Sequence, residues 1–351
     1  FQGNTKGALL LEPSSTNLVT YSNDFSNSSW SKPFTISTNT VISPDGTLNA
    51  STFKASSNSG GVILSTNIAK TAFIKYSFSF YVKKSNHRYI GLSIGTAFTS
   101  SSYNFYDFDT DTINNTIVSP QSAPITRELI GNGWVKLTQV FEMEDSAFLN
   151  SLTRLAMTNS NGSTAYTPSG TEEVYVYGAQ LEQKSYPTSH IPTQGSAVTR
   201  VAEVCNNGGN EQVINSTEGV LYAEISALAD DGTNRQISIS NGGTSQRIYL
   251  GFRTSTNEFI LSSRDSSYII ATVSDITNFN KYAFQYKTGN FKAFVNGVQY
   301  NLTLDGGLLP TGLDRLNFDD GGGSADFYGN VKDIRVYNTA LTDAELQALT
   351  K

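Results

Sequence analysis

The passage near the C-terminus, Phe327-Tyr-Gly-Asn-Val-Lys-Asp-Ile-Arg-Val-Tyr-Asn-Thr-Ala-Leu-Thr-Asp-Ala-Glu-Leu346, sets the architecture of the chain. Val331, Ile334 and Val336 are apolar among polar neighbours, which is typical of a half-buried strand. Thr342 then precedes Glu345 by three residues, which is the spacing of a helix capping box. The passage therefore predicts a strand followed by a short helix.

The composition predicts an all-β protein with many turns. Only 15% of the 351 residues are charged, whereas there are 29 Gly, 18 Tyr and 20 Phe residues. Aromatic residues favour strands, and small polar residues with glycine favour turns. The length suits two domains. We expect two β-sandwich (jelly-roll) domains in tandem, with a short helical turn at the C-terminus.

Charge and cysteine content exclude several classes of function. The formal net charge is −6 and no basic block occurs, which argues against nucleic acid as a partner. No apolar run is long enough for a membrane span, so no membrane insertion is expected, and no signal peptide is visible. A single cysteine, Cys205, and two histidines argue against an intrachain disulfide and a zinc site.

The chain divides at a turn-rich passage near residues 183–215. We predict a domain over residues 7–203, a linker over 204–216 and a second domain over 217–351. Residues 1–6 begin with Phe1-Gln2-Gly3, which resembles the remnant of an expression tag. Alternating or apolar runs predict strands on both sides of the linker. Examples are Tyr76–Val82, Trp134–Phe141, Val174–Tyr177, Gly219–Ile225, Arg235–Ile239, Arg247–Phe252 and Tyr282–Tyr286.

The C-terminal passage resembles the end of laminin G-like, concanavalin A-like lectin domains. Those domains finish on a run of the form D-I/V-R-V/I-Y-N-x-x-L-T-x-x-E-L, which Asp333–Leu346 follows. Phe291-Lys-Ala-Phe-Val-Asn-Gly297 also resembles a recurring element of these domains and ends on a hairpin turn signal. The resemblance covers about residues 210–350 and implies a glycan-binding sandwich.

A second resemblance covers roughly residues 7–200. Several separated motifs look like the jelly-roll module of phage tail-fibre and virion-associated proteins, within the broad group of carbohydrate-binding modules. The motifs are Leu9–Pro13, Thr16–Leu18, Tyr21-Ser22, Phe25, Trp30, Pro44–Gly46, Gly133-Trp134, Gly178–Glu182, Tyr186–Ser189, Ile191–Thr193 and Thr199-Arg200.

Together the two resemblances imply a non-catalytic module that attaches a phage or prophage virion, through a tail fibre or the capsid, to a polysaccharide or other glycan. A virion or extracellular location follows, with a homotrimer as the expected state in a full-length fibre. Two alternatives stay open. Both domains could be purely structural or decorative, or the chain could be the accessory region of a polysaccharide-degrading enzyme.

The sequence offers no constellation for catalysis. Glycosidases need two carboxylates at a defined separation, and no Glu-x-Asp-x-x-Glu run occurs. Adjacent acids such as Glu172-Glu173 point to opposite faces of a strand. No Gly-x-Ser-x-Gly nucleophile elbow is present. We therefore expect no enzymatic activity.

Strand parity suggests ligand-binding residues in the second half. If Ile248, Leu250 and Phe252 face the core, then Tyr249 and Arg253 face outward. The same argument turns Leu316 and Phe318 inward and Asn317 and Asp319 outward. Aromatic rings stack on sugars, and amides, carboxylates and Arg bond hydroxyls. The open alternative is an ordinary solvated sheet face.

In the first half, Tyr103-Asn-Phe-Tyr-Asp-Phe108 holds more aromatic residues than one buried face can use. Phe108 is expected in the core, and Tyr103 or Tyr106 is a candidate platform for a sugar. Trp30 and Trp134 occupy motif positions that indicate packing, so both are expected to be buried.

A structural calcium ion is the one cofactor considered, because both resembled families often hold one through loop carboxylates and carbonyls. Asp230-Asp231 and Asp319-Asp320 each precede a turn in an oxygen-rich loop. The same Asp-Gly pairs also form turns without any metal. No EF-hand pattern occurs.

Overall fold

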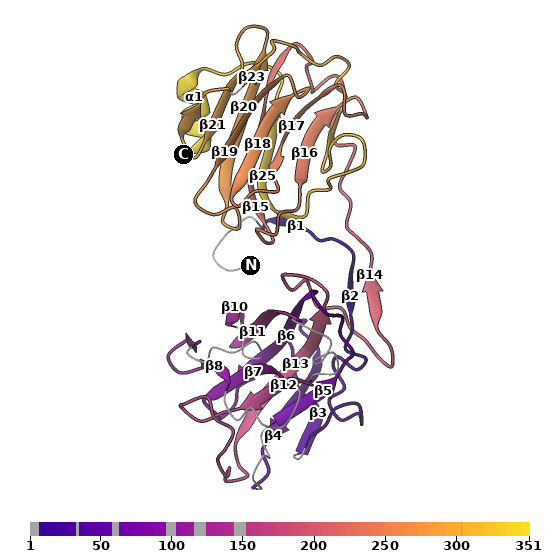
Figure 1. Cartoon of the computed structure of the whole chain (residues 1–351), viewed down its shortest axis with the longest axis vertical. Coiled ribbons are helices and arrows are strands. Elements are labelled where there is room, and N and C mark those ends of the chain that lie inside the picture. Colours follow the sequence, from indigo (N-terminus) through magenta and orange to yellow (C-terminus); the bar gives the residue numbers. More distant parts are fainter. Residues whose placement is uncertain are drawn as a thin grey trace. The chain divides into compact units, whose positions relative to one another are not determined.

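The computed structural model describes residues 7–32, 35–57, 63–95, 103–115, 124–143, 152–302 and 304–351. The chain forms two compact units (Figure 1), and the prediction of two β-sandwiches is confirmed. The first unit contains residues 14–201, and the second contains residues 7–13 and 202–351. No helix among the described residues is long and apolar enough to cross a membrane.

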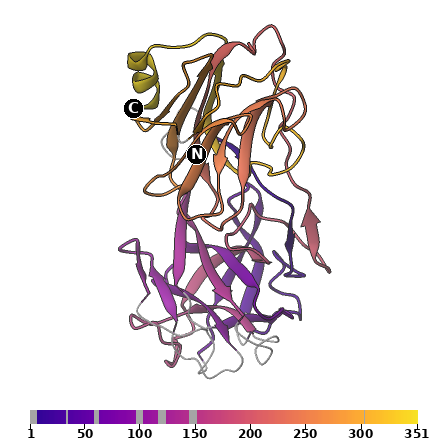
Figure 2. The same cartoon turned by 45° about the horizontal axis from the view of Figure 1, so that its top comes forward.

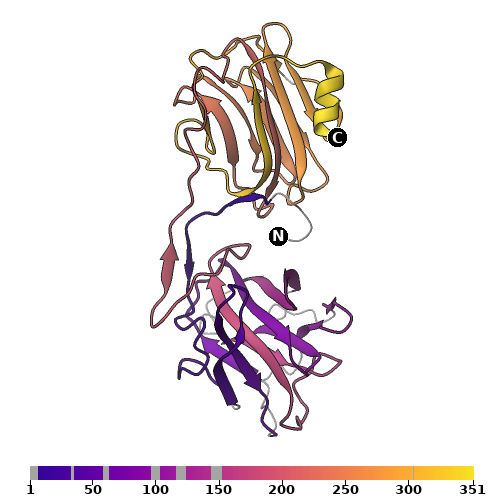
Figure 3. The same ribbon diagram turned by 180° about the vertical axis from the view of Figure 1, so that it is seen from behind.

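The first unit packs two antiparallel sheets face to face. One has the order β10 (Ile125–Gly131), β11 (Trp134–Glu142), β6 (Lys75–Lys84), β13 (Glu173–Glu182), β4 (Leu48–Lys54) and β3 (Thr35–Ile42). The other has the order β5 (Ile63–Asn67), β12 (Leu152–Met157), β7 (Tyr89–Gly95), β8 (Asn104–Asp107) and β9 (Thr112–Asn114). A separate ribbon pairs β2 (Ser15–Asn17) with β14 (Val198–Arg200), as Figure 3 shows.

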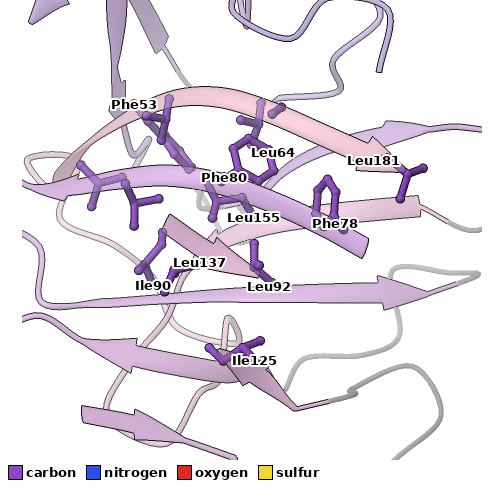
Figure 4. Close-up of a cluster of buried hydrophobic side chains, with 14 of the residues drawn as sticks. Phe53, Leu64, Phe78, Phe80, Ile90, Leu92, Ile125, Leu137, Leu155 and Leu181 are labelled. Atoms are coloured by element: carbon purple, nitrogen blue, oxygen red, sulfur yellow. The ribbon is translucent and has the colours of Figure 1, made fainter. Parts of the chain in front are cut away.

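The core of the first unit lies between its two sheets (Figure 4). Tyr76, Phe78, Phe80 and Val82 alternate along β6 and all four are fully buried, as the period of two predicts. Trp30 lies in the same core, which confirms that expectation. Trp134 is also buried, but in a smaller cluster with Ala50 and Tyr177 outside this core.

The second unit is likewise a pair of six-stranded antiparallel sheets. The first has the order β1 (Leu9–Leu11), β25 (Gly329–Tyr337), β15 (Glu218–Ala227), β20 (Asn280–Lys287), β21 (Lys292–Val295) and β22 (Val298–Tyr300). The second has the order β23 (Leu304–Asp305), β19 (Ser267–Thr272), β18 (Glu258–Ser263), β17 (Arg247–Phe252), β16 (Arg235–Ser240) and β24 (Arg315–Asn317).

The predicted parity of the second unit is confirmed. Ile248, Leu250 and Phe252 of β17 and Phe318 all belong to the core between the sheets. Leu316 is partly buried against the same core. The hairpin signal Asn296-Gly297 joins β21 to β22, and both residues have positive φ, as a two-residue turn of this kind requires.

The C-terminal passage forms the predicted strand and helix. Strand β25 is followed by α1 (Asp343–Thr350), the coiled ribbon beside the C-terminus in Figure 2. The capping box is complete, because the Glu345 N–H donates to Thr342 Oγ1 and the Thr342 N–H donates to Glu345 Oε2. Leu346 then packs with Val220, Tyr222, Ala283 and Phe294 outside the main core.

Two expected boundaries differ from the structure. The sequence predicts residues 7–13 in the first domain, yet β1 pairs with β25, with Leu9 opposite Val331 and Leu11 opposite Gly329. Leu11 is 4% exposed and lies in the second unit's core, so burial of this leucine accounts for the placement.

The segment 204–216 is also more than a linker. Gly208 forms a bridge with Leu316, and Ile214 is buried in the core of the second unit. The exposed Cys205 contributes through its backbone carbonyl, which accepts the Phe318 N–H. The second unit thus begins structurally before residue 217. The predicted tag residues 1–6 lie outside the described part of the chain.

Candidate functional site

Tyr249 lies on the outer face of its sheet, as predicted, but it is not an open platform. The residue is 4% exposed, and the Arg247 guanidinium lies 4.1 Å from the centroid of its ring. The Tyr249 hydroxyl donates a hydrogen bond to Asp265. Burial and this hydrogen bond raise the pKa of Tyr249 to about 12. The ring is already stacked against a cation of the same unit, so no sugar can stack on that side.

Arg253 is the only one of the four second-unit candidates that is not buried. It directly follows β17, and its Nε lies 2.9 Å from Glu258 Oε1. About a third of its side chain is exposed, so the ion pair is screened by solvent. Arg253 remains able to meet a ligand, although the other three candidates do not join it in an open groove.

Asn317 and Asp319 hold the segment of residues 205–208 against the sheet. Asn317 Oδ1 accepts the Asn207 N–H at 2.9 Å. Asp319 is 2% exposed, and its oxygens accept hydrogen bonds from Asn206 Nδ2 and the Gly321 N–H. Both side chains face away from the core, as predicted, but the expectation that they line an open groove is wrong. The segment of residues 205–208 covers them.

The first-unit candidates are also buried. Tyr103 is fully buried, and Tyr106 is 3% exposed and packs in the core. The Tyr106 hydroxyl donates to Asp111 Oδ1 at 2.7 Å. Phe108 is partly buried against the core. Neither tyrosine offers a surface for sugar stacking.

The four aspartates considered for calcium are engaged within the protein. Asp231 accepts two hydrogen bonds from Arg235, at 2.8 and 2.9 Å, and Asp230 accepts the Asn257 N–H. Asp320 accepts the N–H groups of Gly322 and Ser324. Across the described ranges, no three His, Cys, Asp or Glu residues form a group that could hold a metal ion. Calcium binding stays a prediction.

A pocket that the sequence did not reveal lies in the second unit, with a volume of about 400 Å³. Its walls come from the segment before β15, the turn before β24 and the residue after β25. Ile214 and Leu313 are buried beneath the pocket, while the side chains of Glu211, Gln212 and Asn338 are exposed. The lining residues are Glu211, Gln212, Ile214, Asn215, Ser216, Gly312, Leu313 and Asn338.

Hydrogen bonds fix the walls of this pocket. Asn215 Nδ2 donates to the Asn338 carbonyl at 2.9 Å, and the Leu313 N–H donates to Ser216 Oγ at 2.9 Å. The Tyr286 hydroxyl bonds the Asn215 carbonyl at 2.8 Å. The exposed amide and carboxylate groups suit a ligand that carries several hydroxyls. Ile214, an apolar residue within a polar stretch, was the one sequence signal of this packing.

Residues 209–347 match the sequence model of the Concanavalin A-like lectin/glucanases superfamily. This match covers most of the second unit. No curated protein sequence matches the chain.

Several solved structures show weak likeness to the chain. The CBM40 of a Ruminococcus gnavus IT-sialidase is 18% identical with a TM-score of 0.35, over 42% of this chain and 95% of that one. A leech intramolecular trans-sialidase is 20% identical with a TM-score of 0.33, over 39% of this chain and 23% of that one. Domains LG4-5 of the mouse laminin alpha1 chain are 10% identical with a TM-score of 0.27, over 81% of this chain and 88% of that one.

Proposed function

We propose that the chain is a non-catalytic glycan-binding module. The observation that carries this proposal is the match of residues 209–347 to a superfamily of lectins and glucanases. The pocket above Ile214 and Leu313 supports it, because the exposed carboxylate of Glu211 and the exposed amides of Gln212 and Asn338 line it. Such groups bond the hydroxyls of a sugar.

The biological setting is proposed from the sequence resemblance of the first half. In this proposal the chain belongs to a phage or prophage virion protein, trimeric within a fibre, and attaches the particle to a surface polysaccharide. The alternative of an accessory region in a polysaccharide-degrading enzyme predicts a catalytic domain in the adjoining coding sequence. A fibre shaft encoded there would favour the virion instead.

A glycan array tests the binding function. We expect the chain to retain at least one glycan, with affinity falling about fivefold in Gln212→Ala and in Asn338→Ala, as for one lost hydrogen bond each. Gln299→Ala, an exposed glutamine of the same unit outside the pocket, is the matched control. An array without signal above heat-denatured protein would refute glycan binding.

The non-catalytic part of the proposal has its own test. Laminarin, agar, alginate and bacterial capsule polysaccharides should release no oligosaccharide above a boiled control. The sequence reason is the missing carboxylate pair. Reproducible depolymerisation that disappears when one acidic residue is replaced would show that the chain is an enzyme.

A further inference from the structure

A second cavity, of about 620 Å³, lies within the first unit. Its size falls in the range of roughly 300–1,000 Å³ that small-molecule sites occupy. The cavity is formed by the segment after Thr20, the β3–β4 hairpin and the segment before β14. It is lined by Asn23, Asp24, Ser26, Thr38, Asn39, Asn49, Pro192, Thr193 and Gln194.

A bulge in β3 supplies part of the wall. Ser37 pairs with Thr52 and Val41 pairs with Ala50, so three residues of β3 oppose Ser51 alone. Thr38 and Asn39 lie in this bulge, where Asn39 has a φ of 57°. Bulges redirect side chains and are common beside binding sites. Here the bulge places a hydroxyl and an amide at the cavity.

Two asparagines of the wall are held in fixed orientations. Asn23 Oδ1 accepts the Gly178 N–H at 3.1 Å and lies 3.2 Å from His190 Nε2. Burial lowers the pKa of His190 to about 4, so the neutral ring donates from Nε2 at pH 7. With its oxygen committed in this way, Asn23 keeps Nδ2 as a donor for another group.

Asn49 is a second fixed part of the wall. Its Nδ2 donates to Asp45 Oδ2 at 2.9 Å, and the Tyr177 hydroxyl donates to the same oxygen at 2.7 Å. Asn49 Oδ1 is buried, and within the described part of the chain it has no hydrogen-bond partner. Because solvent does not reach this oxygen, Asn49 forms a fixed part of the wall and is not itself an acceptor for a ligand.

The chemistry of the lining selects the ligand class. The nine residues include three asparagines, a glutamine, a serine and two threonines, and their only ionisable side chain is the acid Asp24. An anionic ligand would meet no positive charge on these residues, whereas a polyol would meet donors and acceptors together. The exposed Pro192 ring adds an apolar surface.

We propose that this cavity is a binding site for a neutral saccharide, separate from the pocket of the second unit. Asn23 would donate to a sugar hydroxyl, and Gln194 would donate to one or accept from one. Gln194 is exposed and makes no side-chain hydrogen bond within the part of the chain that is described. The proposal rests on the proposed function only in taking glycans as the ligands.

Saturation-transfer NMR on the whole chain tests this site. The probes are lactose, maltose, cellobiose and N,N'-diacetylchitobiose, with 3'-sialyllactose as the anionic comparison. We expect at least one neutral disaccharide to bind, with affinity reduced about fivefold in Asn23→Ala and in Gln194→Ala. Asn161→Ala, an exposed asparagine of the same unit outside the cavity, should bind like the unmodified chain.

The outcomes separate this site from the proposed function. Binding that falls only in Gln212→Ala would refute the first-unit site and leave the second-unit pocket intact. The absence of transfer to all four neutral disaccharides, or transfer to sialyllactose alone, would also refute it, while the glycan array judges glycan binding itself. If Asn23→Ala fails to fold, Gln194→Ala decides, because the exposed side chain of Gln194 bonds no other side chain in the described part of the chain.

Discussion

At the scale of the residue, the contact between Arg247 and Tyr249 explains how an outer-face tyrosine becomes buried. Arg247 is 7% exposed, and its Nη1 donates to the Asp320 carbonyl at 2.7 Å. Its guanidinium can therefore cover the ring of Tyr249 in a fixed position. An arginine held in this way contributes packing as well as charge. The cluster of Arg247, Tyr249 and Asp265 thus stabilises the sheet.

Substitution of Tyr249 should measure that contribution. We expect Tyr249→Ala to lower the free energy of unfolding of the second unit by about 3 kcal/mol, because a buried aromatic ring is removed. Tyr249→Phe should cost about 1 kcal/mol through the lost hydrogen bond to Asp265. Differential scanning calorimetry of the whole chain would measure both. Arg253→Ala is the control, because this side chain is partly exposed and its ion pair is screened by solvent. Equal stability of Tyr249→Ala and Arg253→Ala would contradict the burial of the ring.

The same residue shows what strand parity can predict. The alternation of β17 gave the direction of Tyr249 correctly, since Ile248, Leu250 and Phe252 fill the opposite face. Exposure depends in addition on what covers a face. For Asn317 and Asp319 the cover is the segment 205–208, whose pairing with β24 is not local in sequence. No pattern within β17 or β24 contains that information.

His190 should make the stability of the first unit depend on pH. Burial, with nearby Lys136, lowers its pKa from 6.5 to about 4, so the unfolded chain binds the proton more readily than the folded one. Stability should be full above pH 6.5 and should fall as the pH drops towards 4, by about 3 kcal/mol at most. The pKa of His87 is also lowered by burial and acts in the same direction.

Urea unfolding followed by tryptophan fluorescence suits this measurement, because both tryptophans, Trp30 and Trp134, belong to the first unit. His190→Gln should make the free energy of unfolding depend less on pH between 6.5 and 4. The smaller dependence that remains is the contribution of His87. Carboxylates such as Asp45, whose pKa is lowered by hydrogen bonds that outweigh its burial, should act only below that window. An unchanged profile in His190→Gln would contradict the assignment.

At the scale of the element, a bulge in β25 explains why its apolar residues are not spaced with a strict period of two. Val331 and Ile334 are three residues apart, yet both pack on the core between the sheets. Ile225 pairs with Val331 while Glu224 pairs with Asp333, which leaves Lys332 as the extra residue of a bulge. The bulge shifts the alternation by one and lets Val331, Ile334 and Val336 share a face. The apolar spacing predicted the strand, and the bulge is the reason that its period was irregular.

The capping box at the start of α1 should stabilise the helix locally. We expect Thr342→Ala to cost about 1 kcal/mol, because the Glu345 N–H loses its acceptor. Glu345→Gln should cost less, since an amide oxygen can still accept the Thr342 N–H. Hydrogen exchange of the helix amides would report both changes. Equal protection in Thr342→Ala and the unmodified chain would show that packing of Leu346, and not the cap, holds the helix.

At the scale of the whole molecule, the chain enters the first unit from the second and then returns to it. Strand β1 belongs to the second unit, β2 and β14 pair within the first, and residues 202–351 complete the second. The sequence predicted two sandwiches because each half has its own set of apolar strands. It did not predict this crossing, because Leu9–Leu11 is a short apolar run that fits the edge of either unit. Only its pairing with β25, some 320 residues later, decides between them.

The contribution of β1 can be tested by matched leucine substitutions in the whole chain. Leu11 is 4% exposed in the core of the second unit, whereas Leu10 points to the other face and is 36% exposed. We expect Leu11→Ala to destabilise the second unit by about 2–5 kcal/mol as a core truncation, and Leu10→Ala to have a much smaller effect. Calorimetry would show the loss, and tryptophan fluorescence should report no change in the first unit.

Two fragments test the same assignment. The fragment of residues 202–351 lacks β1 and leaves the β25 edge unpaired, so it should melt at a lower temperature than the second unit of the whole chain. The fragment of residues 14–201 should retain its stability. If Leu11→Ala and Leu10→Ala are equally mild and the 202–351 fragment is as stable as the second unit of the whole chain, β1 is not part of the second sandwich.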